Sequence, residues 1–123
     1  MRIFGRRDNT GESESVISDD LRQRTVRLFA LVGETISAAT LALLGGDREA
    51  GKIAVARDEE IDRLARELIH EVQQLLLHDP APSVMDREEL LTLLRILPEV
   101  ERNGDLAEHI ARRAVRGLGA EMS

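Results

Sequence analysis

The first half of the sequence carries a run of apolar and small side chains with the period of a packed helix. Between about Ser15 and Leu44 they follow one another at alternating spacings of four and three residues. The run consists of Leu21, Thr25, Leu28, Val32, Thr35, Ala39 and Ala42. Such spacing places a continuous stripe on one helix and predicts lengthwise packing against neighbours. Gly45 and Gly46 end the pattern, because glycine readily adopts the left-handed conformation that closes helices.

A second helix is predicted after these glycines. Asp47 is a suitable N-cap, and the helix continues to about Leu77. Its stripe consists of Ala50, Ala54, Asp58, Ile61, Ala65, Leu68, Val72 and Leu75. The segment HDPAPS at 78–83 then predicts a turn, because each proline disfavours helix in the residue before it.

A third helix begins with Ser83 or Asp86 as its cap and runs to about Gly117. Pro98 removes one of its backbone hydrogen bonds and is expected to bend it. We therefore predict an all-α fold, an up-down-up three-helix bundle over residues 15–118, because short turns make consecutive helices antiparallel neighbours. The polar residues 1–14 are expected to form a disordered N-terminal tail, and residues 119–123 a C-terminal tail.

Composition agrees with helices and narrows the function. Of 123 residues, 33% are charged and only 2% aromatic, which is typical of helices packed on helices. The absence of cysteine excludes disulfides and thiolate chemistry. A net charge of −6 argues against nucleic acid as a partner, since phosphate binding needs a basic face. We interpret Arg112, Arg113 and Arg116 as cations that complement the C-terminal end of the third helix.

The chain is expected to be cytoplasmic and to meet a membrane only through partner proteins. Its basic start is not followed by the apolar core of a signal peptide. The most apolar stretch, Leu28 to Gly46, contains Glu34. A central acid costs about 2.5–3.5 kcal/mol on membrane-insertion scales, so we interpret this stretch as the most buried helix of a soluble bundle.

Two pairs of acids stand on or beside the apolar stripes. They belong to Asp58-Glu-Glu-Ile-Asp62 and Glu101-Arg-Asn-Gly-Asp105. Acids four residues apart share one side of a helix and repel each other. If the turn is centred near position 81.5, residue i of the second helix faces residue 163 − i of the third. Asp58 then faces Asp105, and Asp62 faces Glu101. Four carboxylates in a partly buried space need a proton, an arginine or a cation nearby.

The residues alone leave two interpretations of these acids. The carboxylates could lie in water and pair with Arg57, Arg63 or Arg102. The matched register instead favours a cation site, and oxygen ligands suit Mg²⁺, Mn²⁺, Ca²⁺ or iron. Gly33, which falls opposite Asp58 across the first turn, either leaves room for the ion or makes a close helix contact.

From about Leu28 to Arg116 the chain resembles one repeat of the PhoU family of phosphate-uptake regulators. The resemblance rests on the two acid-x-x-x-Asp motifs and on ERNGDLAEHIARRA, which is similar to the family's Glu-Arg-Ile-Gly-Asp followed by Ala and an amphipathic helix end. It implies that Asp58, Asp62, Glu101 and Asp105 bind a divalent metal ion (iron, zinc, Mg²⁺ or Mn²⁺). It also implies a regulator without enzymatic activity that contacts a phosphate transporter or a sensor histidine kinase.

The sequence departs from the family's pattern in three respects. The family usually carries two repeats, and this chain has length for one. The third helix begins Asp86-Arg87-Glu88 where Asp-Leu-Arg is typical, so an acid replaces the arginine. Asn103 stands where isoleucine is usual and makes the surroundings of the acids more polar.

Two alternative functions stay open. A carboxylate di-iron oxidase is also a helix bundle, but it needs Glu-x-x-His on two helices. Only Glu67-Leu-Ile-His70 fits, because His78 and His109 have no acid three residues before them. His109 could instead extend the metal site, since it follows Asp105 by four residues. The other alternative is a metal-free structural dimerisation bundle.

A second apolar row on the first helix predicts an interface. Phe29, Ile36 and Leu43 recur at seven-residue spacing beside the main stripe, and an exposed apolar row of that length usually marks a contact surface. Because the two repeats of the family pack side by side in one chain, the resemblance implies a homodimer. Two copies would reproduce the two-repeat arrangement about a two-fold axis.

Overall fold

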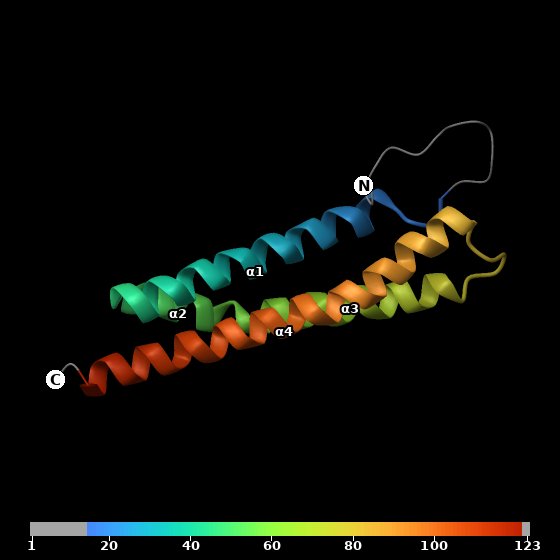
Figure 1. Cartoon of the computed structure of the whole chain (residues 1–123). Coiled ribbons are helices and arrows are strands. Elements are labelled where there is room, and N and C mark those ends of the chain that lie inside the picture. Colours follow the sequence, from blue (N-terminus) through green and yellow to red (C-terminus); the bar gives the residue numbers. More distant parts are fainter. Residues whose placement is uncertain (1–14, 122–123) are drawn as a thin grey trace.

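Four helices form a bundle with three antiparallel limbs (Figure 1). The computed structural model describes the backbone of residues 15–121 and the side chains up to residue 117. Its helices are α1 (Asp19–Gly45), α2 (Arg48–Ala56), α3 (Asp58–Leu76) and α4 (Val84–Glu121). α2 and α3 follow one another end to end and together form one of the three antiparallel segments, here called the middle limb. In the sequence this limb lies between α1 and α4, which form the other two segments. The described residues contain no strand, so the all-α prediction is confirmed.

The ends of the helices follow local signals in the sequence. The side chain of Asp47 accepts a hydrogen bond from the Ala50 N–H at 3.0 Å and caps α2 as expected. Gly46 has a φ of 70°, and its N–H donates to the Leu41 carbonyl, which closes α1. Of the two expected caps of α4, Ser83 takes the role, since its hydroxyl accepts from the Asp86 N–H at 3.1 Å.

The expected ends of the bundle change in detail. α4 extends to Glu121, past the end predicted near Gly117. The predicted N-terminal tail, residues 1–14, lies outside the described residues. Asp86 is buried and ties the entry of α1 to α4, because its carboxylate accepts from the Ser15 hydroxyl and the Val16 N–H, both at 3.0 Å.

The second predicted helix is interrupted, which corrects the expectation of a continuous helix to Leu77. α2 ends at Ala56 and α3 begins at Asp58, with Arg57 as a turn between them. Three acids follow this turn, Asp58, Glu59 and Glu60. Carboxylates are favoured in the first turn of a helix, where they complement the positive end of the macrodipole. Because of the interruption, these three acids lie in the first turn of α3 and not in the middle of a helix, and their charges stabilise that helix start.

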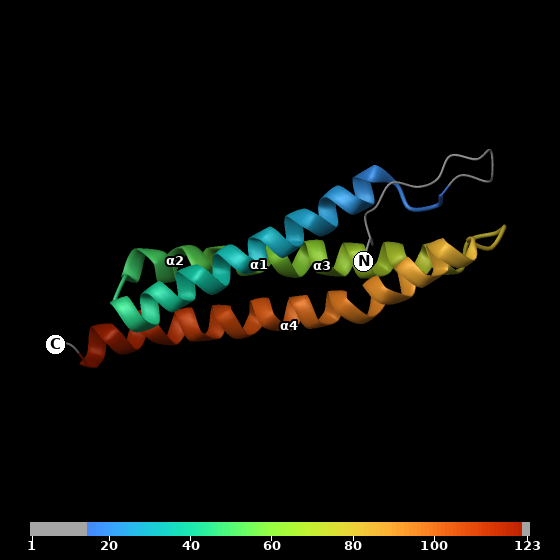
Figure 2. The same cartoon turned by 45° about the horizontal axis from the view of Figure 1, so that its top comes forward.

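The core changes in character along the bundle. A leucine-rich cluster lies between α1, α3 and the first half of α4, and includes the fully buried Leu28, Leu68 and Leu97. A cluster of alanines, including Ala54 and Ala111, fills the space around α2. Small side chains let the helices approach closely at that end. α4 continues through Pro98 without interruption and curves in its first half (Figure 2).

Two buried glycines set the spacing of α4. A Cβ added at Gly104 would lie 3.1 Å from Ile61 Cγ2, and one at Gly51 would lie 2.6 Å from Val115 Cγ2. A Cβ at Gly51 would force Val115 or the backbone to shift, and one at Gly104 would be a tight contact, so glycine favours the close approach of α4 to α2 and α3. Gly104 precedes Asp105 and Ile61 precedes Asp62, so the same approach brings the two acid motifs together.

α1 is long and apolar enough to cross a membrane by length and composition alone. In the bundle it buries Leu21, Leu28 and Thr35 completely against the other helices. Thr35 is satisfied within its own helix, since its hydroxyl donates to the Leu31 carbonyl at 2.8 Å. One face of α1 thus packs into the core, as expected, while Phe29, Ile36 and Leu43 on its other face are exposed.

Candidate metal centre

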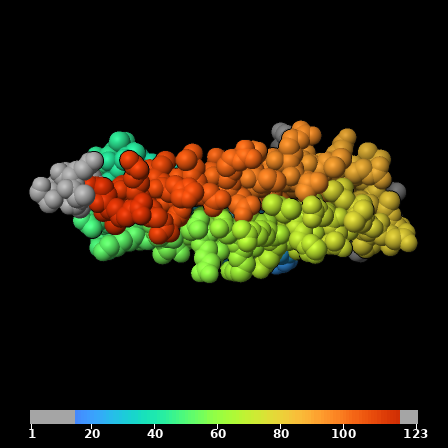
Figure 3. All heavy atoms as spheres, turned by 90° about the horizontal axis from the view of Figure 1, so that it is seen from below, coloured from blue at the N-terminus to red at the C-terminus, as the bar shows by residue number. Residues whose placement is uncertain are grey.

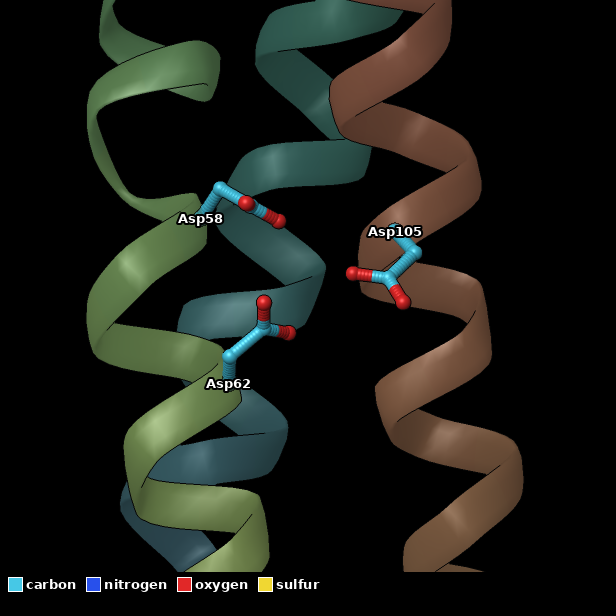
Figure 4. A group of neighbouring side chains, drawn as sticks. All are labelled: Asp58, Asp62 and Asp105. Carbon is cyan, nitrogen blue, oxygen red and sulfur yellow. The ribbon is translucent and has the colours of Figure 1, made fainter.

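Three aspartates meet in the groove between α3 and α4. Asp58 and Asp62 lie on successive turns of α3 and point toward Asp105 on α4 (Figure 4). One carboxylate oxygen from each residue lies within 4.8 Å of the other two. All three side chains are half-buried. Asp58 faces Asp105, as expected for two antiparallel helices joined by a turn centred near position 81.5.

The oxygens of this group are poorly satisfied by the protein. Asp58 Oδ1 and Asp62 Oδ1 are buried and have no hydrogen-bond partner. An ionised carboxylate only accepts hydrogen bonds, so three neighbouring carboxylates cannot satisfy one another. Buried acceptors without a donor are rare in folded proteins and call for an explanation. A proton or a bound cation would supply one.

Burial and mutual repulsion raise the pKa values of the α3 aspartates. For Asp62, burial raises the pKa to about 6, and the charges of Asp58, Asp105 and Glu101 act in the same direction. For Asp58, burial is again the largest cause of a raised pKa, followed by the charges of Glu108 and Asp105. The site therefore disfavours three simultaneous negative charges.

Glu101, the fourth predicted ligand, is not in the close group. Its Oε2 lies 3.7 Å from Nε of Arg66 on α3. The Arg66 side chain is 76% exposed, so this ion pair is weak. Glu101 still faces the site, because its charge contributes to the raised pKa of Asp62.

Glu108 is a fifth acid near the site. It was not among the four ligands predicted from the two acid motifs. It is only 4% exposed, and Arg112 Nε donates to its Oε2 at 2.6 Å. Glu108 follows Asp105 by three residues on α4, so the two share one side of the helix, and the charge of Glu108 raises the pKa of Asp58. The spacing of 101, 105 and 108 on one helical face was a signal in the sequence that could have identified it.

The arginines that could have neutralised the aspartates are engaged elsewhere. Arg57 binds Glu34 at 2.9 Å, Arg63 contacts Glu67 at 3.3 Å, and Arg102 contacts Glu99 at 3.4 Å. The acids therefore do not pair with Arg57, Arg63 or Arg102, and the arginine contact that one of them makes is that of Glu101 with Arg66. Gly33 is exposed, and a Cβ there would meet nothing within 4 Å, so the alternative of a close helix contact is wrong.

The site is open to solvent along α3. A hollow of about 640 Å³ adjoins Asp58 and Asp62 and is also lined by Glu59, Arg63, Arg66 and Glu67. An ion could therefore enter without opening of the bundle. Oxygen donors from carboxylates, together with water from such a hollow, suit a hard divalent cation. The three aspartates would hold the ion, and the ion would supply the missing positive charge.

The histidines take no part in the close group. His109 is 75% exposed at its side chain, and its Nε2 lies 3.7 Å from Glu108 Oε1. His70 and Glu67 are both exposed on α3. Among the described residues, the group of possible ligands contains only aspartates. The convergent Glu-x-x-His pairs of a di-iron oxidase are therefore not formed there.

The fold and the site together define a helix-bundle module with a cluster of carboxylates between two antiparallel helices. A family model described as the PhoU domain matches residues 25–114. The chain belongs to the PhoU domain family.

Three curated relatives are similar over 79% of the chain. Two are phosphate-specific transport system accessory protein PhoU homologs from strains of Xylella fastidiosa, at 36% and 35% identity. The third carries the same name, comes from Aquifex aeolicus and is 28% identical. The matched part spans only 41–43% of the length of these relatives. No solved structure matches the chain.

Proposed function

We propose that this chain is a PhoU-type regulator of phosphate uptake that binds a divalent cation between Asp58, Asp62 and Asp105. The observation that carries the proposal is the approach of three carboxylates to within 4.8 Å, with two buried oxygens that no donor satisfies. These residues belong to the acid motifs that the resemblance to the family singles out. Glu101 could complete the ligand set, because its pairing with exposed Arg66 is weak.

The regulator would act through protein contacts in the cytoplasm and not by catalysis. The relatives are named as accessory proteins of a phosphate-specific transport system. Components of such a transporter, or a sensor histidine kinase, are therefore the partners we propose. Membrane contact would be made through these partners.

Asp105→Asn should abolish stabilisation of the fold by divalent cations. The wild-type chain, stripped with chelator, is expected to melt on the order of 10 °C higher at a Mn²⁺ or Mg²⁺ concentration of about 100 times the dissociation constant. The variant should show no such rise, because the close group loses one of its three carboxylates and the only one on α4. Glu99→Gln on the exposed face of α4 is the matched control. A full response in Asp105→Asn, or none in the wild type, contradicts the metal site.

Co-purification tests the role in phosphate uptake. The tagged chain, recovered from solubilised membranes of its source cells, is expected to retain components of a phosphate transporter or a sensor histidine kinase. Chelator and Asp105→Asn should each reduce this recovery if the cation shapes the binding surface. Recovery of nothing but a second copy of the chain would contradict the regulator and favour the metal-free structural dimerisation bundle.

A homodimer is part of the same proposal. An apolar groove of about 290 Å³ between α1 and α4 is lined by Ile36, Ala39, Thr40, Leu43, Leu44, Asn103, Leu106, Ala107 and Ile110. The row expected at an interface is exposed beside it, with Phe29 and Ile36 at 44% and Leu43 at 53%. The curated relatives are more than twice as long as the matched part, so they have length for a second bundle. A second copy would supply that bundle here.

A further inference from the structure

The arginines near the end of α4 need an account other than the one the sequence gives. The sequence pattern favours their role as cations that complement the helix end. α4 continues to Glu121, however, so Arg112, Arg113 and Arg116 all lie more than one turn before its last residue. The influence of the macrodipole falls off within the last turn. Their position is therefore not explained by the helix terminus.

Two of these arginines border a groove between α2 and α4. The groove has a volume of about 380 Å³ and is lined by Lys52, Val55, Ala56, Arg112, Val115 and Arg116. Figure 3 shows the C-terminal part of α4 (red) beside α2 (green) on one face of the molecule. Val55, Ala56 and Val115 supply the apolar part of the lining, here called the floor, and Lys52, Arg112 and Arg116 supply its cations, here called the rim.

The rim keeps an excess of positive charge. Arg112 is held by Glu108, and Lys52 has Glu49 at 3.5 Å, an exposed pair that is weak in water. Arg116 is exposed and has no ionic partner among the described residues. In a chain with a net charge of −6, this is a local reversal of sign. A partner that fits the groove must combine an apolar surface with negative charge.

We propose that the groove between α2 and α4 docks an acidic amphipathic helix of a partner protein. Its apolar side chains would pack on Val55 and Val115, and its carboxylates would pair with Lys52 and Arg116. A groove between two helices accepts the ridge of a third, which is a common mode of peptide recognition. A small anion fits less well, because the floor is apolar. A membrane surface fits less well too, since lipid-binding clusters commonly hold four to eight cations.

This inference rests on the proposed function, since it names the chemistry of the partner that the regulator would contact. The groove and the aspartate cluster use different residues, so each can be tested while the other is intact. Arg113 provides a matched control, because it is an exposed arginine on the same helix that does not line the groove.

The test uses the full chain and a fluorescent helical peptide of about 18 residues, with leucines at helical spacing flanked by glutamates. Anisotropy should show saturable binding that weakens as salt rises from about 50 to 300 mM. Arg116→Glu should raise the dissociation constant at least about tenfold, and Arg113→Glu should change it less than about twofold. A second peptide with lysine in place of every glutamate should bind Arg116→Glu better than the wild type.

Several outcomes would overturn the docking proposal. One is equal weakening by Arg113→Glu and Arg116→Glu, and another is equal binding of a peptide with glutamine in place of glutamate. Absence of saturable binding, or binding only to vesicles rich in anionic lipid, would also overturn it. Repeating the titration in Asp105→Asn separates the two proposals. A full metal response in this variant with normal peptide binding overturns only the metal site. Loss of the metal response in this variant, in a chain whose wild type binds no peptide, overturns only the groove.

Discussion

Leu106→Glu should disrupt the proposed homodimer and leave a monomer of 13.7 kDa. Leu106 is 58% exposed and lines the apolar groove between α1 and α4, opposite Leu43 and Ile36. In a two-fold interface each substitution occurs twice, so two carboxylates would enter an apolar contact without a partner. Several kcal/mol of lost affinity, or at least a thousandfold rise in the dissociation constant, is the expected size of the effect.

Light scattering after size exclusion, at several protein concentrations, measures this change. Leu77→Glu is a suitable control, because Leu77 is 78% exposed at the end of α3 and lies outside the groove. That variant should remain a dimer. For a dimer with a dissociation constant of about 1 μM, the wild-type chain should be dimeric at a protein concentration of about 100 μM. A monomer at that concentration would contradict the dimer itself. Equal dissociation of both variants would place the interface elsewhere.

The metal-free chain should lose stability as the pH rises from about 4 to about 7, and Asp62→Asn should remove most of that loss. The folded-state pKa of Asp62 is about 6, against an ordinary value of 3.8. Between these values the folded chain binds more protons than the unfolded chain, so the free energy of unfolding falls as the pH rises. The difference corresponds to roughly 3 kcal/mol at most. Asp58, whose pKa is also raised, contributes in the same direction.

Urea unfolding in chelator at a series of pH values measures this loss of stability. At neutral pH, Asp62→Asn should be more stable than the wild type, because the amide removes one repelling charge. Glu67→Gln, an exposed change on the same helix, should leave the pH dependence unaltered. Saturating Mn²⁺ should reverse the order, since the ion neutralises the wild-type site. A wild type whose stability rises steadily from pH 4 to 7 would contradict the raised pKa.

The acid motifs show how far a sequence can place a site. The helical period, the caps and the short second turn were enough to predict that Asp58 faces Asp105. These signals are local, and antiparallel packing carries them from one helix to the next. The direction of a long side chain is not local. Glu101 lies in the predicted row, but Arg66 attracts its carboxylate from the facing helix.

Neither the interruption at Arg57 nor the role of Glu108 was predicted from the sequence, and the reasons differ. The pattern of Ala54, Asp58 and Ile61 continues across Arg57 with helical period, so periodicity alone predicts an unbroken helix. The three acids after Arg57 were a sign of a helix start that this pattern concealed. Glu108 is buried because Arg112 neutralises it. This pairing of two charges near a third group depends on how the helices pack.

The single turn at Arg57 is the joint between α2 and α3. α2 and α3 are joined by one residue, and a small change in its backbone angles would tilt one helix against the other. Asp58 stands on one side of this joint, and the wall of the α2–α4 groove stands on the other. An ion that draws Asp58 toward Asp105 would therefore change the tilt of α2 relative to α3.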